Sequence, residues 1–112
     1  MMENTIKVSI SVNAAANLLE REIIEGSITG TLIDRYEVRS SDNKKCVMMI
    51  FEKHYYRAGN RLTLTVLIDD LEGYTRVHYI AGGGGEGLFR FDWGAAESFE
   101  EVVYEALRKY II

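Results

Sequence analysis

The sequence predicts an α+β fold with the element order β-α-β-β-β-β-β-α, in which a mostly antiparallel, six-stranded curved sheet carries two helices on one face. Several segments alternate between apolar and polar residues, as half-buried strands do. Two other segments place apolar residues at helical spacing. The later segments are joined by connections too short for crossover helices, so their strands pair antiparallel. With 112 residues, one domain over residues 1–112 is expected.

The first strand and the first helix are predicted near the N-terminus. Residues 6–12 alternate between β-branched apolar residues and Lys or Ser, which predicts a half-buried strand. Asn13 is predicted to cap a helix that extends to about Glu25. Gly26 then takes the C′ position, which favours glycine.

Five further strands are expected between the two helices. They are placed at about residues 28–39, 46–57, 61–68, 74–81 and 88–93. The strand at 46–57 begins apolar on both faces, with Val47, Met49 and Phe51 on one and Cys46, Met48 and Ile50 on the other. Such a strand needs a cover on both sides. Two helices cannot cover all of a six-stranded sheet, so the exposed part is expected to be polar, ligand-covered or paired with another subunit.

The last helix is predicted from a capping box and an apolar stripe. Ser98 and Glu101 have the S-x-x-E spacing in which side chains and backbone N–H groups bond reciprocally. About 13 residues from Phe99 onward then follow helical spacing.

Composition excludes several classes of protein. The chain has no proline, which suits long paired strands, and a single cysteine, which excludes a disulfide framework. Its 13 basic and 17 acidic residues give a net charge of −4 without a basic run, so nucleic-acid binding is not expected. No apolar stretch approaches the length of a membrane span. The lone Cys46 and the lack of a secretory signal predict a cytoplasmic protein.

Glycines cluster in one predicted loop. Five of the 10 glycines lie within residues 82–87 and satisfy G-x-G-x-x-G. The alternating segment that follows predicts a strand where a dinucleotide site needs a helix, so dinucleotide binding is not expected. The segment is either a hairpin loop or a loop whose backbone N–H groups approach a ligand, which makes Gly83, Gly84 and Gly85 candidate binding residues.

Polar residues supply the other candidates. Asp34 shares a predicted strand face with Leu32 and Tyr36, so it is either a buried carboxylate with an arginine partner such as Arg61 or part of an exposed face. Tyr56 is a candidate for a pocket mouth, because it and its neighbour Tyr55 point to opposite faces.

The two histidines, His54 and His78, are further candidates for ligand binding. A metal site would need both of them and a carboxylate to converge across strands, and histidines on a sheet surface are commoner, so no metal is expected. Cys46 and His54 lie roughly 26 Å apart along one predicted strand and cannot form a catalytic dyad.

Several motifs carry a resemblance to known proteins. They are Gly26-Ser27-Ile28-Thr29, Gly59-Asn60-Arg61-Leu62-Thr63-Leu64, Gly82-Gly83-Gly84, Phe89-Arg90 and Trp93-Gly94. Over most of its length the chain resembles a domain-of-unknown-function family of short, mainly Gram-positive bacterial proteins. It is more distantly similar to helix-grip domains of the birch-pollen-allergen and lipid-transfer type, although it has one short helix where those usually have two. That similarity implies a small cavity between the sheet and the C-terminal helix.

Three functions are compatible with these observations. The first is a small non-enzymatic binding domain that holds an apolar or amphipathic ligand between the sheet and the C-terminal helix, with Met48 and Met49 as adaptable lining residues. The second is a homo-oligomerisation or protein-interaction module that uses the uncovered sheet face or an edge strand. The third is an enzyme with a polar site built from Asp34, the histidines and arginines, which no nucleophile–base pair supports. No cofactor is expected.

Overall fold

The computed structural model describes residues 4–26, 29–55, 60–83 and 93–112. The described elements are β1 (Thr5–Val8), α1 (Val12–Glu25), β2 (Thr31–Arg39), β3 (Lys45–Tyr55), β4 (Asn60–Asp69), β5 (Thr75–Gly83), α2 (Trp93–Leu107) and the short 3₁₀ helix η2 (Arg108–Tyr110). The fold therefore has the predicted α+β class, and its described element order is β-α-β-β-β-β-α.

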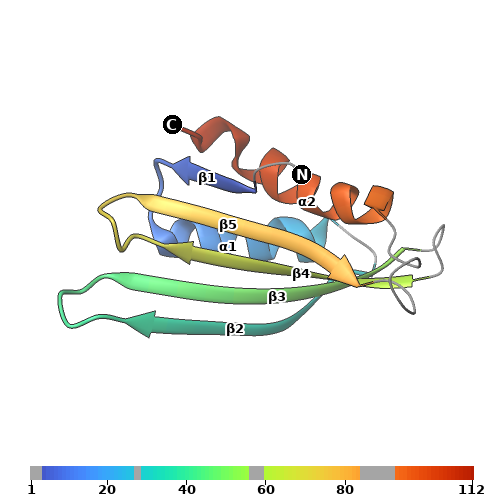
Figure 1. Ribbon diagram of the computed structural model, residues 1–112, viewed down its shortest axis with the longest axis horizontal. Coiled ribbons are helices and arrows are strands. Elements are labelled where there is room, and N and C mark those ends of the chain that lie inside the picture. The colour runs from blue at the N-terminus through green and yellow to red at the C-terminus, as the bar shows by residue number, and fades with distance from the viewer. Residues whose placement is uncertain (1–3, 27–28, 56–59, 84–92) are drawn as a thin grey trace.

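All five strands belong to one antiparallel sheet with the order β1-β5-β4-β3-β2. The strands β2 to β5 are neighbours in both sequence and space. Helix α1 connects β1 at one edge of the sheet with β2 at the opposite edge, as Figure 1 shows. The C-terminal segment closes the structure against β1, where Ile111 forms a bridge with Val8.

Both helices pack against the same face of the sheet. Helix α1 contacts β2, β3 and β4, and α2 contacts β4, β5 and α1. The buried strand residues on this face are Val8, Val47, Met49, Phe51, Leu62, Leu64, Val66, Ile68, Thr75, Val77, Tyr79 and Ala81. The buried helix residues are Val12, Ala15, Ala16, Leu19, Ile23, Ala95, Ala96, Phe99, Val103 and Leu107. This single layer of apolar side chains stabilises the fold through its removal from water.

The first helix begins earlier than its sequence pattern predicts. The N-cap is Ser11 and not Asn13, because the Ser11 hydroxyl accepts a hydrogen bond from the backbone N–H of Ala14 at 3.1 Å. The preceding strand accordingly ends at Val8 rather than at residue 12. Val12 is buried as the first member of the apolar stripe of α1.

The C-terminal helix is also longer than predicted, and the prediction of a capping box at Ser98 is wrong. The helix begins at Trp93 and Ser98 lies within it. Ala95 and Ala96 are buried one turn before Phe99 and extend the same apolar stripe toward the N-terminus of the helix, so the helix does not start at the polar residue.

The described sheet has five strands rather than six. The sixth strand was predicted at residues 88–93, of which 88–92 lie outside the described residues and Trp93 is helical. Five strands and two helices therefore make up the architecture that the structure describes.

A register shift in β2 changes which of its residues share a face. The pairing of β2 with β3 is irregular between Leu32 and Asp34, where Ile33 is the extra residue of a bulge. Leu32 lies opposite the buried Phe51, whereas Asp34 lies opposite Ile50 on the other face. The prediction that Leu32 and Asp34 share a face is therefore wrong, because one extra residue reverses the alternation.

Candidate functional site

The face of the sheet that points away from both helices is the most distinctive surface of the molecule, and we call it the open face. The strand pairing assigns these side chains to it: Thr5 and Lys7 from β1; Thr31, Asp34, Tyr36 and Val38 from β2; Cys46, Met48, Ile50, Glu52 and His54 from β3; Arg61, Thr63, Thr65, Leu67 and Asp69 from β4; and Arg76, His78 and Ile80 from β5.

Large apolar side chains gather at the centre of the open face. Tyr36, Val38, Leu67 and Ile80 have exposed fractions of 60%, 49%, 39% and 53%. Between them on β3 lie Cys46, Met48 and Ile50, which are half-buried. The register joins them into adjacent rows, since Tyr36, Met48 and Leu67 are direct cross-strand partners. The result is a contiguous apolar patch rather than scattered single residues.

Charges on the open face lie around this patch and balance one another. The cationic side chains are Lys7, Arg61 and Arg76, and the carboxylates are Asp34, Glu52 and Asp69. Lys7 lies over the Tyr74 ring, with Nζ 4.2 Å from the ring centroid. The open face is therefore close to neutral on a chain whose net charge is −4.

The buried member of this set is Asp69, which is 4% exposed. Arg76 lies directly opposite and donates from Nε and Nη2 to the two Asp69 carboxylate oxygens at 3.2 and 3.0 Å. The backbone N–H of Leu71 donates to the same carboxylate at 3.1 Å. The hydrogen bonds that Arg76 donates to Asp69, together with an ion pair to Glu72 at 3.1 Å, raise the pKa of Arg76 above its ordinary value. These two hydrogen bonds link β4 to β5 next to the turn that joins them.

Cys46 lies beside this pair, opposite Asp69 in the register. Burial and the negative charge of Asp69 raise the pKa of the Cys46 thiol. A thiol with a raised pKa is protonated at neutral pH and reacts slowly as a nucleophile. The cysteine is consequently a small apolar member of the patch and not an activated group.

Of the two alternatives that the sequence left for Asp34, the structure shows the exposed one, because Asp34 is exposed on the open face. The buried carboxylate is Asp69, which was not among the candidates from the sequence. One signal in the sequence identifies Asp69 as a carboxylate with an arginine partner. Asp69 and Arg76 are equidistant from the centre of the turn between β4 and β5, so closing the hairpin brings opposite charges face to face.

The structure does not bring the two candidate histidines together. His54 lies opposite Arg61 and His78 lies opposite Leu67, so the two rings are separated by about 20 Å along the strands. His78 Nδ1 is 2.6 Å from the Thr5 hydroxyl, and the His54 backbone N–H donates to the Thr29 hydroxyl at 3.2 Å. Arg61 pairs with Glu52 at 3.3 Å. Among the described residues, no group of three or more His, Cys, Asp or Glu side chains could hold a metal ion.

Of the glycine candidates, Gly83 is described and ends β5. Its φ of +88° lies in the left-handed region that side chains rarely adopt, which explains a glycine at this position. Gly84, Gly85 and Tyr56, the other candidates from the sequence, lie outside the described residues.

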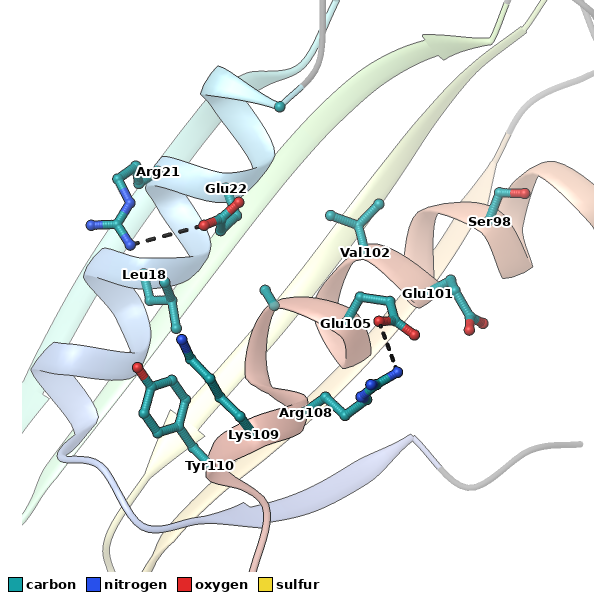
Figure 2. A pocket seen from close by; sticks show the side chains of 12 residues that line it. Leu18, Arg21, Glu22, Ser98, Glu101, Val102, Glu105, Arg108, Lys109 and Tyr110 are labelled. Atoms are coloured by element: carbon teal, nitrogen blue, oxygen red, sulfur yellow. Dashed lines mark ion pairs between the residues drawn. The ribbon is translucent and has the colours of Figure 1, made fainter.

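A groove of about 700 Å³ separates the outer surfaces of α1 and α2 (Figure 2). Its walls carry three cations and three carboxylates, and four of these charges form two ion pairs: Arg21 with Glu22 at 3.9 Å and Arg108 with Glu105 at 3.5 Å. Leu18 and Val102 lie between the helices in the same view. The described lining of the groove thus has no net charge.

None of the helices in the described part of the chain is both long and apolar enough to cross a bilayer.

Comparison with known proteins identifies the family to which the chain belongs. No curated protein and no solved structure matches the chain. The model of the family of unknown function DUF6054 matches residues 1–111, and the chain belongs to that family.

Proposed function

We propose that the protein is a non-enzymatic self-association module in which the open faces of two copies pack against each other. The observation that carries this proposal is the apolar patch at the centre of the open face, where four large apolar side chains are between 39% and 60% exposed. Water contact with these side chains is unfavourable, and a second copy of the same face removes it on both partners at once.

The size of the open face is sufficient for a stable dimer. At about 3.3 Å per residue and 4.8 Å between strands, the five strands present roughly 700 Å² on each copy. Two such faces in contact bury about 1,400 Å², which is within the range of about 1,200–2,000 Å² found for specific interfaces. The balanced charges of the face also favour a second copy, because a chain of net charge −4 approaches itself with least repulsion through a neutral surface.

The edges of the sheet are less suited to association than its face. Edge strand β1 has only four residues, and the C-terminus lies along it: Ser9 N–H donates to Tyr110 C=O at 2.8 Å and Ile112 N–H to Lys7 C=O at 3.1 Å. Edge strand β2 contains the bulge at Ile33 and several charged residues. Short length, bulges and charges are the features that prevent pairing at a sheet edge.

The other functions expected from the sequence have less support. Met48 and Met49, which motivated a ligand between the sheet and the C-terminal helix, point to opposite faces, and Met49 is fully buried among core side chains, so the two methionines do not line a common site there. An enzyme site built from Asp34 and the two histidines is not supported, because these residues are spread along the open face.

The proposal is tested by placing a charge in the patch. Ile80→Arg introduces a cation at the centre of the open face, and Leu71→Arg introduces the same cation in the β4–β5 turn at a residue of nearly equal exposure, 51% against 53%. We expect light scattering to show a dimer for the wild type and for Leu71→Arg. For Ile80→Arg we expect a dissociation constant at least about 100-fold larger, because each interface then buries unpaired charges.

Circular dichroism of both variants checks that they fold. Equal molar masses for the wild type and both variants over the whole concentration range would contradict the proposal, as would a wild type that stays monomeric at the highest concentration.

A further inference from the structure

A separate pocket lies on the opposite side of the sheet from the open face, between α2 and the strands β1 and β5. Its volume is about 310 Å³, at the lower end of the range for small-molecule sites. The described residues that line it are Asn4, Ile6, Tyr79, Glu97, Glu100, Glu101 and Tyr104. Four of them, at positions 97, 100, 101 and 104, have the spacing of one helix face, so α2 presents a single wall to the pocket.

Tyr79 is the feature of this pocket that points to a ligand. The residue is 5% exposed, and its backbone N–H donates to Asn4 C=O at 2.9 Å. Its phenolic hydroxyl has no hydrogen-bond partner among the described residues. A buried tyrosine hydroxyl ordinarily has a partner, so this one is available to a molecule in the pocket. Burial and the charges of Glu100 and Glu101, which line the same pocket, raise the pKa of Tyr79, so its hydroxyl stays protonated at neutral pH.

The carboxylates give the pocket its charge. Glu100 is fixed in place, because one of its oxygens accepts a hydrogen bond from the Ala81 backbone N–H at 2.9 Å. Within the described part of the chain, neither Glu97 nor Glu101 forms an ion pair. The three carboxylates give the described lining of the pocket a net negative charge, which favours a cationic ligand over a neutral or anionic one.

The chemistry of the walls indicates the kind of cation. Carboxylates close enough together to hold a metal ion are not found among the described residues. Two tyrosine rings, Tyr79 and Tyr104, and the aliphatic side chain of Ile6 line the same space. Aromatic rings attract organic ammonium groups through their faces and also pack against carbon. Anionic and aromatic groups around one small space therefore suit an amine that has an apolar body.

We propose that this pocket binds a small organic amine, with its ammonium group between the Glu97 and Glu101 carboxylates and the Tyr79 hydroxyl, and its apolar body against Ile6 and Tyr104. The Tyr79 oxygen accepts a hydrogen bond from the ammonium group. Because the site lies on the helix side of the sheet, it does not depend on association through the open face, and the two proposals fail or succeed separately.

The test uses two amine probes, benzylamine and cyclohexylamine, each compared with its neutral alcohol. Titrations are followed by NMR through the methyl group of Ile6 and the backbone amides of Tyr79, Ala81 and Tyr104. We expect both amines to shift these signals and to bind at least about tenfold more tightly than the alcohols, because the ammonium forms charge-assisted hydrogen bonds.

Variants separate the groups involved. Tyr79→Phe keeps the ring and removes the hydroxyl, and Glu97→Gln removes one charge at the helix surface without threatening the fold. We expect each to weaken amine binding by about tenfold. Glu105→Gln, on the same helix but on the wall of the other groove, is expected to leave binding unchanged.

Three results would overturn the proposal: equal affinity for amine and alcohol, affinities of Tyr79→Phe and Glu97→Gln equal to that of the wild type, or titrations in which neither amine shifts the signals of the pocket.

Discussion

On the face of the sheet that meets the helices, Leu64 and Val66 of β4 are fully buried, whereas Leu67 on the open face is 39% exposed and Thr65 is half-buried. Strand β3 shows the same contrast, with Met49 fully buried and Met48 half-buried. Both faces are apolar at the centre of the sheet, but among the described residues the helices cover only one of them. The large apolar residues on the other face are the observation on which the proposed association rests.

The largest difference between the two faces is expected in stability. Leu64→Ala removes a fully buried side chain and leaves a cavity, so we expect it to lower the free energy of unfolding by about 2–5 kcal/mol. Thr65→Ala, at the adjacent residue on the open face, is expected to cost less than about 1 kcal/mol. Urea unfolding of both variants in the Ile80→Arg background measures the difference without a contribution from association. Equal losses at the two positions would mean that the faces are not distinct.

The sequence predicted the helix-covered face better than the open face, for reasons visible in single residues. In the strand predicted at about residues 61–68, Leu62, Leu64, Val66 and Ile68 occupy alternate positions, and all four are fully buried on the helix-covered face. No glycine or proline in the sequence marks the bulge at Ile33. Because of this bulge, Asp34 lies on the open face and points away from the core.

The starts of both helices were predicted too late in the sequence, for a related reason. Ser98 has the sequence of a cap, but tertiary packing of Ala95 and Ala96 extends the helix past it. Local propensity is a weak guide wherever burial decides the outcome. Asp69 and Arg76, in contrast, could have been found by counting outward from the turn that joins their strands.

A smaller effect is expected in the rate at which Cys46 is alkylated, because this residue lies on the open face. Its raised pKa makes it a slow nucleophile at neutral pH, and in the proposed dimer a second copy would shield it further. We expect the rate constant for alkylation of wild-type protein to fall several-fold as protein concentration rises. The monomeric Ile80→Arg variant should react at one rate throughout. A rate constant that does not change with concentration in either protein would exclude contact at this part of the face.

The smallest expected effect concerns Tyr79 on the helix-covered face. Burial raises its pKa above the ordinary value of about 10, so the folded state holds the phenolic proton more tightly than the unfolded state does. Its contribution to stability is fully present below about pH 10 and is lost as the pH rises above that value. We therefore expect Tyr79→Phe to lose less stability than the wild type between about pH 8 and about pH 11 in urea unfolding.

Tyr36→Phe, at a residue that is 60% exposed on the other face of the sheet, serves as the control for this pH dependence. A Tyr79→Phe variant with the same alkaline loss as the wild type would show that the hydroxyl is not held in a buried site.

The account rests on contact between two open faces, and NMR on a mixture of isotope-labelled and unlabelled chains measures that contact directly. We expect intermolecular nuclear Overhauser effects from the methyl groups of Met48, Leu67 and Ile80, and none from the methyl groups of Leu18 and Val102 on the helices. Intermolecular effects confined to the helices, or their absence at every concentration, would contradict the account.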